Sequence, residues 1–213
     1  MLFRGLKPGC FFVVLYAALK APLFHGRAGC LSAHSRIFLM VRKDILALLV
    51  GGDRRSIGQA DRVAKMVSDD IALFAELIAG LWSENPLVPM RAADATEKIT
   101  RKHRELLQPY RKELLGLMAE AQEQELRWHL AVMVPRLLLN AKERQAAVSL
   151  LEGYLEDRSS IVKTFALQGL ADMAEADSSF REKVVEILGE AARKGTPAMK
   201  ARSRKLLILL GRI

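Results

Sequence analysis

A repeat of about 37 residues constrains the fold of this 213-residue chain more than any other feature of its sequence. In each copy an aliphatic residue, usually followed by a base, opens a segment whose apolar residues recur at helical spacing. These segments begin 38, 36 and 37 residues apart, at Val88, Leu126, Val162 and Met199. Another helical pattern precedes each of them, marked by paired aliphatic residues at Leu77–Ile78, Leu114–Leu115, Leu150–Leu151 and Ile187–Leu188.

A helix pair of this length can bury its apolar stripe only against neighbouring pairs, so such repeats stack into an array. We therefore expect an all-α fold, a right-handed superhelix (α-solenoid) of about four to five two-helix repeats. The segments Asp44–Val50 and Ile57–Val67 are less regular, although they carry helical apolar spacing around Gly51–Gly52. We interpret them as a divergent first pair that caps the array.

Residues that favour helix starts support these boundaries independently of the apolar pattern. Asn85–Pro86 and Thr196–Pro197 each place a side-chain acceptor before a proline, which suits an N-cap and the first helical position. Ser159 occupies the N-cap place of another second helix. Capping-box spacing occurs twice among the first helices, in Asn140 with Glu143 and in Ser179 with Glu182.

The repeat units resemble HEAT repeats of the broader armadillo-like helical superfamily, as found in small bacterial proteins. The matching features are the period, the small residues of the second helix and its aliphatic-base opening, at Leu126–Arg127, Val162–Lys163 and Met199–Lys200. The likeness covers roughly Asp44–Ile213, within a repeat domain that we expect over 40–213. Pro89 replaces the base in the first clear unit. The resemblance implies a scaffold that binds a protein or peptide, because most members of this superfamily do so.

If the resemblance holds, the second helices line a concave face. In the first clear unit the core positions are then Val88, Ala92, Ala95, Thr96 and Ile99. Outward positions two and six residues after the aliphatic start supply Met90, Asp94, Trp128, Thr164, Gln168 and Lys205, and the base row supplies Arg127, Lys163 and Lys200. We expect these side chains to contact the partner.

The assignments of Trp128 and of the base row each have a structural alternative. A large aromatic such as Trp128 can anchor a partner, but it can equally fold over a neighbouring helix as part of the core. Bases such as Arg127, Lys163 and Lys200 can meet carboxylates or phosphates of a partner, but they can also pair with an acid of the adjacent repeat.

We expect no enzyme activity, no catalytic residue, no metal and no cofactor. The four histidines lie apart in sequence, and none stands beside a carboxylate as in the HEAT-like iron hydroxylases. A glycine-rich phosphate loop, paired cysteines and a nucleophile elbow are all missing from the sequence. The alternative is a DNA-binding or DNA-repair protein like the alkylation-repair glycosylases, to which Trp128 and Asp94 are the only similarities.

The charge of the chain is uneven, and this bears on nucleic-acid binding. The net charge is +9, yet residues 40 to 190 hold 21 bases against all 24 acids. The excess of bases lies at the two ends, and the C-terminal end from Ala191 contains seven bases and no acid. A basic groove along the whole protein is therefore disfavoured, while the C-terminal end could attract phosphate or an acidic partner.

The first 39 residues form a separate compositional zone with five bases and no acid. We treat 1–39 as a leader, and three interpretations stay open: translation that begins at Met40, a targeting segment, or a folded element. The apolar run Cys10–Leu19 is too short to span a membrane, so we expect no transmembrane anchoring. Cys10 and Cys30 are the only cysteines, which favours a reducing, cytoplasmic location.

Overall fold

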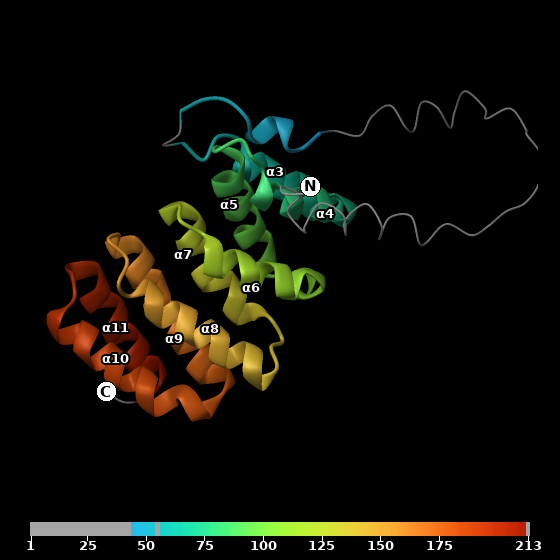
Figure 1. Cartoon of the computed structure of the whole chain (residues 1–213). Helices are drawn as coiled ribbons and strands as arrows, with labels where there is room; N and C mark the ends of the chain where they lie inside the picture. Colours follow the sequence, from blue (N-terminus) through green and yellow to red (C-terminus); the bar gives the residue numbers. More distant parts are fainter. Residues whose placement is uncertain (1–43, 54–55, 212–213) are drawn as a thin grey trace, which may run out of the picture. The chain divides into compact units, whose positions relative to one another are not determined.

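A computed structural model describes residues 44–53 and 56–211, and the predicted leader lies outside the described residues. The described residues belong to one compact unit, Asp44–Ile213. Within the described residues every regular element is a helix, in agreement with the predicted all-α class (Figure 1). The α-helices are α3 (Ala60–Asp69), α4 (Phe74–Ala79), α5 (Val88–Thr100), α6 (Arg111–Glu120), α7 (Gln124–Met133), α8 (Ala141–Tyr154), α9 (Ser160–Ala176), α10 (Arg181–Lys194) and α11 (Pro197–Leu209). Short 3₁₀ segments join them: η1 (Ala47–Leu49), η2 (Ile71–Leu73), η3 (Gly80–Trp82), η4 (Arg104–Tyr110), η5 (Val134–Arg136) and η6 (Ser178–Phe180).

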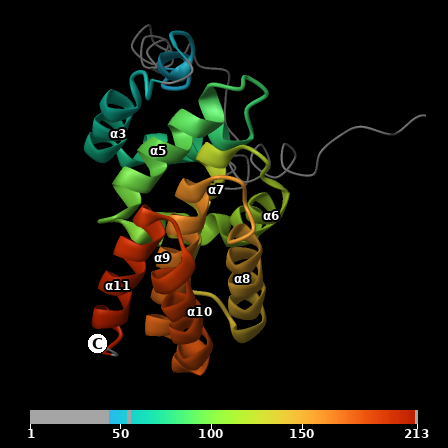
Figure 2. The same ribbon diagram turned by 90° about the vertical axis from the view of Figure 1, so that its left-hand side faces the viewer.

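Helices that occupy the second position of the sequence repeat contact one another in chain order. Each second helix contacts the next along the chain, so that α3 packs on α5, α5 on α7, α7 on α9 and α9 on α11 (Figure 2). The first helices α8 and α10 pack against the second helices that follow them. The five core positions predicted for α5 are all buried, with no side chain more than 4% exposed. Helical periodicity therefore identified the buried side of α5.

Three of the predicted caps are present. Asn140 forms a complete capping box at α8, because its side chain accepts from the Glu143 N–H at 3.0 Å while the Glu143 carboxylate accepts from the Asn140 N–H at 2.9 Å. The side chains of Ser159 and Thr196 cap α9 and α11. These caps satisfy amides that the first turn of a helix leaves without a partner.

Two other boundaries differ from the prediction. The expected capping box of Ser179 with Glu182 is absent, because Asp177 accepts from both the backbone and the hydroxyl of Ser179, and α10 begins two residues later. Asn85 accepts from the Leu87 N–H within a turn, and α5 itself begins at Val88. In both places a short polar side chain stabilises a tight turn before the helix.

Pro135 shortens the last turn of its helix. The α-helical part of α7 ends at Met133, and the chain continues as the 3₁₀ turn η5 with Pro135 in its first turn. Proline lacks the N–H that the next α-helical hydrogen bond would need, and a change to 3₁₀ geometry accommodates this loss.

The first unit departs from the expected helix pair. Its first segment forms only the 3₁₀ turn η1, while α3 takes the place of a second helix against α5. Arg91 of α5, which is 1% exposed, holds the intervening loop. Its guanidinium donates to the backbone carbonyls of Leu49, Gly51, Asp53 and Ser56 at 2.5–3.1 Å. Arg91 thus fixes the loop, while the first segment still buries Ile45 and Leu49 in the core.

Candidate functional site

The candidate site is the row of partly buried side chains that the second helices leave at the surface, here called the second-helix face. Contacts from helix to helix connect its members, which are Asp94 and Lys98 of α5, Trp128 of α7, Phe165, Gln168 and Asp172 of α9, and Arg202 of α11. The face therefore extends across four stacked helices.

Two aromatic rings lie at the centre of this face. Trp128 and Phe165 stack across the α7–α9 interface, with 4.9 Å between ring centroids and 26° between ring planes. Trp128 also lies against the ring of His129. Both rings of the pair pack against the core and remain partly exposed. A stacked aromatic pair is rigid and has a large apolar surface, which is the character of an anchor point in protein interfaces.

A polar chain continues from this pair onto α11. The Arg202 guanidinium lies over the Phe165 ring, 5.6 Å from its centroid, and donates to the Gln168 Oε1 at 2.7 Å. The Gln168 Nε2 donates in turn to the Asp172 carboxylate at 2.7 Å. Burial raises the pKa of the Asp172 carboxyl. The face therefore holds a cationic group of α11 next to a neutral and an acidic group of α9.

An ion-pair network covers the α5 side of the face. The Lys98 ammonium pairs with Asp94 of its own helix at 2.7 Å and with Asp61 of α3. His129, 2% exposed, lies with its Nε2 3.7 Å from the Asp94 Oδ1, while its Nδ1 is 2.6 Å from the Glu125 carbonyl oxygen. Burial alone would raise the pKa of the Asp94 carboxyl, but His129 and Lys98 lower it below its ordinary value. Asp94 is therefore held as a carboxylate.

Of the predicted base row, Arg127 makes contacts within the fold. Its Nη1 pairs with Asp157, which precedes α9, its Nε donates to the Ala121 carbonyl at 2.7 Å, and its guanidinium lies over the Tyr154 ring. The structural alternative for this residue, pairing with an acid of the adjacent repeat, is confirmed. Lys163 and Lys200 are half-buried and have no ion pair within the described residues, and Lys205 is exposed.

One predicted outward position is wrong. Thr164 is 8% exposed, and its hydroxyl donates back to the Ser160 carbonyl at 2.7 Å. Phe165, which the sequence prediction missed, takes the outward place beside Trp128. The signal was available, because Phe165 follows Trp128 by the 37-residue period whereas Thr164 follows it by 36. Counting from the aliphatic start of α9 selected Thr164 rather than the next residue, which lies about 100° further around the helix.

Met90 and Gln168 match the prediction in being partly exposed. No group of three His, Cys, Asp or Glu residues within 44–53 and 56–211 could hold a metal ion. A surface depression of about 430 Å³ is lined by residues outside the second-helix face, namely Ala141, Gln145, Asp177, Ser179, Phe180 and Lys183.

Comparisons with protein-family models, curated proteins and solved structures found no match. None of the described helices has the length and the apolar character needed to cross a membrane.

Proposed function

We propose that this chain is a HEAT-like α-solenoid scaffold without enzymatic activity, which binds a segment of a partner protein along its second-helix face. Trp128 and Phe165 anchor an apolar side chain of the partner, and the polar groups around them fix its orientation. The observation that carries this function is the stacked aromatic pair at the centre of the face, with partly exposed rings from two neighbouring units.

The order of helix contacts supports the solenoid part of this function. Each second helix from α3 to α11 meets its neighbours in sequence, as stacking of repeats requires. The character of the polar groups supports binding rather than chemistry. Asp94 and Lys98 are tied into ion pairs, and His129 is buried against the backbone of its own helix. The ion pairs hold Asp94 and Lys98 as fixed charges that orient a surface, rather than as a free acid or base.

A selection of displayed random peptides on the full chain tests this function. Selected peptides should bind wild type, and Trp128→Ala should weaken them about 30-fold, the loss of a hot-spot anchor worth about 2 kcal/mol. The matched control is Trp82→Ala, because Trp82 of η3 is 43% exposed and belongs to a different part of the unit. If Trp128→Ala binds the selected peptides as well as Trp82→Ala and wild type do, the second-helix face is not the binding site.

Circular dichroism separates loss of binding from loss of folding. If Trp128→Ala melts far earlier than wild type, Trp128 serves the core, and Gln168→Arg then tests the exposed part of the face. Selected peptides that bind the Gln168→Arg variant as well as wild type would contradict the proposed site.

Duplex DNA is the competing ligand, and fluorescence anisotropy at about 50 and 200 mM salt distinguishes it. Tight binding that falls steeply with salt, and that is lost on neutralising Lys200, Arg202, Arg204 and Lys205, would replace the scaffold function by a nucleic-acid function. We expect weak binding because acids outnumber bases between residues 40 and 190.

A further inference from the structure

The cross-unit ion pair of Arg127 has no equivalent one unit later. Arg127 and Lys163 stand at the same place, four residues after the N-caps of α7 and α9. Asp157, the partner of Arg127, lies two residues before the N-cap of α9. The corresponding residue before the N-cap of α11 is Lys194. The acid that would neutralise Lys163 is therefore replaced by a base.

Three cations, Lys163, Lys194 and Lys200, consequently lie around the starts of α9 and α11, and Arg202 and Lys205 follow further along α11. We call these five residues the basic end. Lys163 and Lys200 occupy equivalent places on two packed helices, whose axes lie roughly 8–10 Å apart in such contacts. Among the residues that the structure describes, Lys194 pairs only with Glu190 of its own helix, and both side chains are exposed. No carboxylate occurs from Ala191 to Gly211.

The basic end adjoins the aromatic pair. Arg202 belongs to both, because its guanidinium lies over Phe165. Only one of its nitrogens donates to Gln168, so its remaining N–H groups can donate to a ligand. Arg202 therefore joins the aromatic pair of α7 and α9 to the cations of α11.

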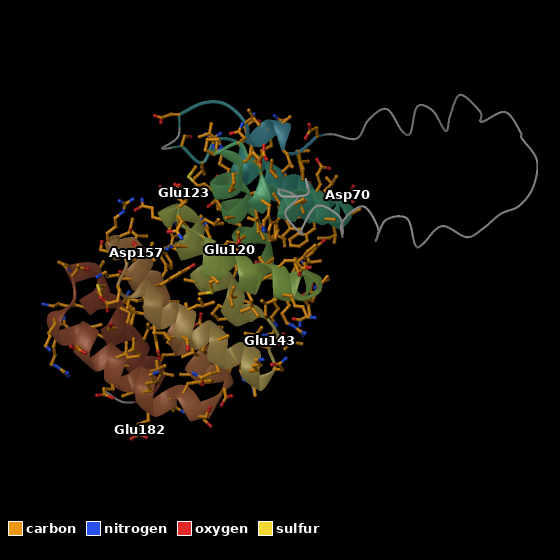
Figure 3. All side chains as sticks on the ribbon, in the orientation of Figure 1. Asp70, Glu120, Glu123, Glu143, Asp157 and Glu182 are labelled. Atoms are coloured by element: carbon orange, nitrogen blue, oxygen red, sulfur yellow. The ribbon has the colours of Figure 1, made fainter. Side chains whose placement is uncertain are left out.

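The distribution of acids limits the length of an anionic ligand. Glu120 ends α6, and Glu123 and Glu125 lie at the start of α7. Figure 3 shows Glu123 and Asp157 along the same side of the described residues. A long polyanion that followed the starts of the second helices would reach these carboxylates and be repelled. A short acidic segment that spans only α9 and α11 would not.

We propose, building on the peptide-binding function above, that the basic end recognises a short acidic peptide segment of the partner. Carboxylates of the segment pair with Lys163, Lys194 and Lys200, and an adjoining apolar side chain packs on Phe165 and Trp128. Arg202 donates to a carboxylate between these two contacts. Charge thus selects the partner, while the aromatic pair supplies apolar contact area.

The probe for this inference is a fluorescein-labelled dodecapeptide of glutamate with one central leucine, measured by anisotropy with the full chain. We expect salt-sensitive binding and no binding of the matching lysine peptide. Lys163→Glu with Lys200→Glu should weaken the acidic peptide at least tenfold, since two attractive contacts become repulsive. Lys142→Glu, an exposed substitution at the start of α8, should change binding less than twofold.

Each other outcome overturns the inference in a recognisable way. Equal binding of the acidic peptide to wild type and to the double variant would exclude the basic end, and Lys163→Gln with Lys200→Gln repeats the test if the double variant unfolds. Tighter binding of duplex DNA through the same lysines would assign the surface to nucleic acid. A salt-sensitive dimer in sedimentation, without peptide binding, would assign it to a second copy of the chain. If display-selected peptides need Trp128 while the glutamate peptide does not bind, the inference fails and the proposed function stands.

Discussion

Arg127 of α7 and Asp157, just before α9, form an ion pair that joins two neighbouring units. The Asp157 side chain is 5% exposed and also accepts from the Ser159 N–H at 2.7 Å, so it ties the turn before α9 to the preceding unit. Burial alone would raise the pKa of the Asp157 carboxyl, but the Ser159 amide and Arg127 lower it. The pair thus holds the α7–α9 stack at one end.

Loss of Arg127 should destabilise the stack. Arg127→Ala leaves a nearly buried carboxylate without its partner and removes the contacts to Ala121 and Tyr154, and we expect it to lower the free energy of unfolding by about 2–4 kcal/mol. Urea unfolding monitored by circular dichroism measures this. Glu190→Gln is the control, because the Lys194–Glu190 pair is exposed and its loss should have little effect. Similar stability of Arg127→Ala and wild type would show that the pair does not join the units.

Gly169 sets the approach of α9 to α7. A Cβ at this position would lie 2.3 Å from the Ala131 carbonyl oxygen and 2.9 Å from a methyl carbon of Leu151. Gly169→Ala should therefore destabilise the protein by about 1–3 kcal/mol, although alanine is the better helix former.

The matched control for Gly169 is Gly116→Ala in α6. A Cβ at Gly116 meets nothing within 4 Å, so this substitution should stabilise the protein by about 0.5–1 kcal/mol. Thermal unfolding of the two variants should shift in opposite directions. A stabilised Gly169→Ala variant would mean that α7 and α9 do not approach as closely as described.

Local rules predicted the helices well because their signals are short-range. The capping box of Asn140 with Glu143 involves residues three apart, and the core positions of α5 follow from helical periodicity within one segment. Neither depends on a distant part of the chain. The same holds for Pro135, whose missing N–H acts on its own helix.

The errors arose where a distant contact decides the outcome. The face of α9 that points outward depends on its rotation against α7, which the aliphatic start of the helix does not specify, and so Phe165 was missed in favour of Thr164. Arg91 was not recognised because its carbonyl partners lie 35 to 42 residues earlier in the chain. For Arg127 the sequence left a partner contact and an ion pair with the adjacent repeat as alternatives, and only the structure identifies Asp157 as the acid.

Acid should weaken the fold through carboxyls whose pKa lies below the ordinary value. Burial alone would raise the pKa of Glu97, but Arg101 and Arg136 lower it, and the pKa values of Asp94 and Asp157 are lowered as well. A carboxyl of this kind contributes stability that is fully present above its unfolded pKa, near 4, and that is lost as the pH falls through its folded pKa. The pKa of Asp172 is raised, so protonation of this carboxyl at low pH favours the folded state.

Glu97→Gln isolates one of these contributions. At pH 7 the variant should be less stable than wild type by about 1–3 kcal/mol, because Arg101 and Arg136 lose a charged acceptor. The difference should begin to shrink as the pH falls below the unfolded pKa of glutamate, about 4.3, and should be lost as the pH falls through the lower folded pKa of Glu97. Urea unfolding at several pH values measures both curves, and a difference that does not depend on pH would exclude the charge of Glu97 as its cause.

Arg91 should be irreplaceable by another cation. Its planar guanidinium reaches four carbonyls of one loop at once, whereas the ammonium of Arg91→Lys offers three donors from a single atom and cannot span them. Buried carbonyls left without a donor cost about 1–3 kcal/mol each, so we expect a loss of at least 2 kcal/mol and release of the loop from Val50 to Gly58. Hydrogen exchange should show faster exchange in this loop and in α3, with α9 and α11 unaffected. Uniformly faster exchange would instead indicate that the first unit and the later units unfold together, and that Arg91 stabilises the whole stack.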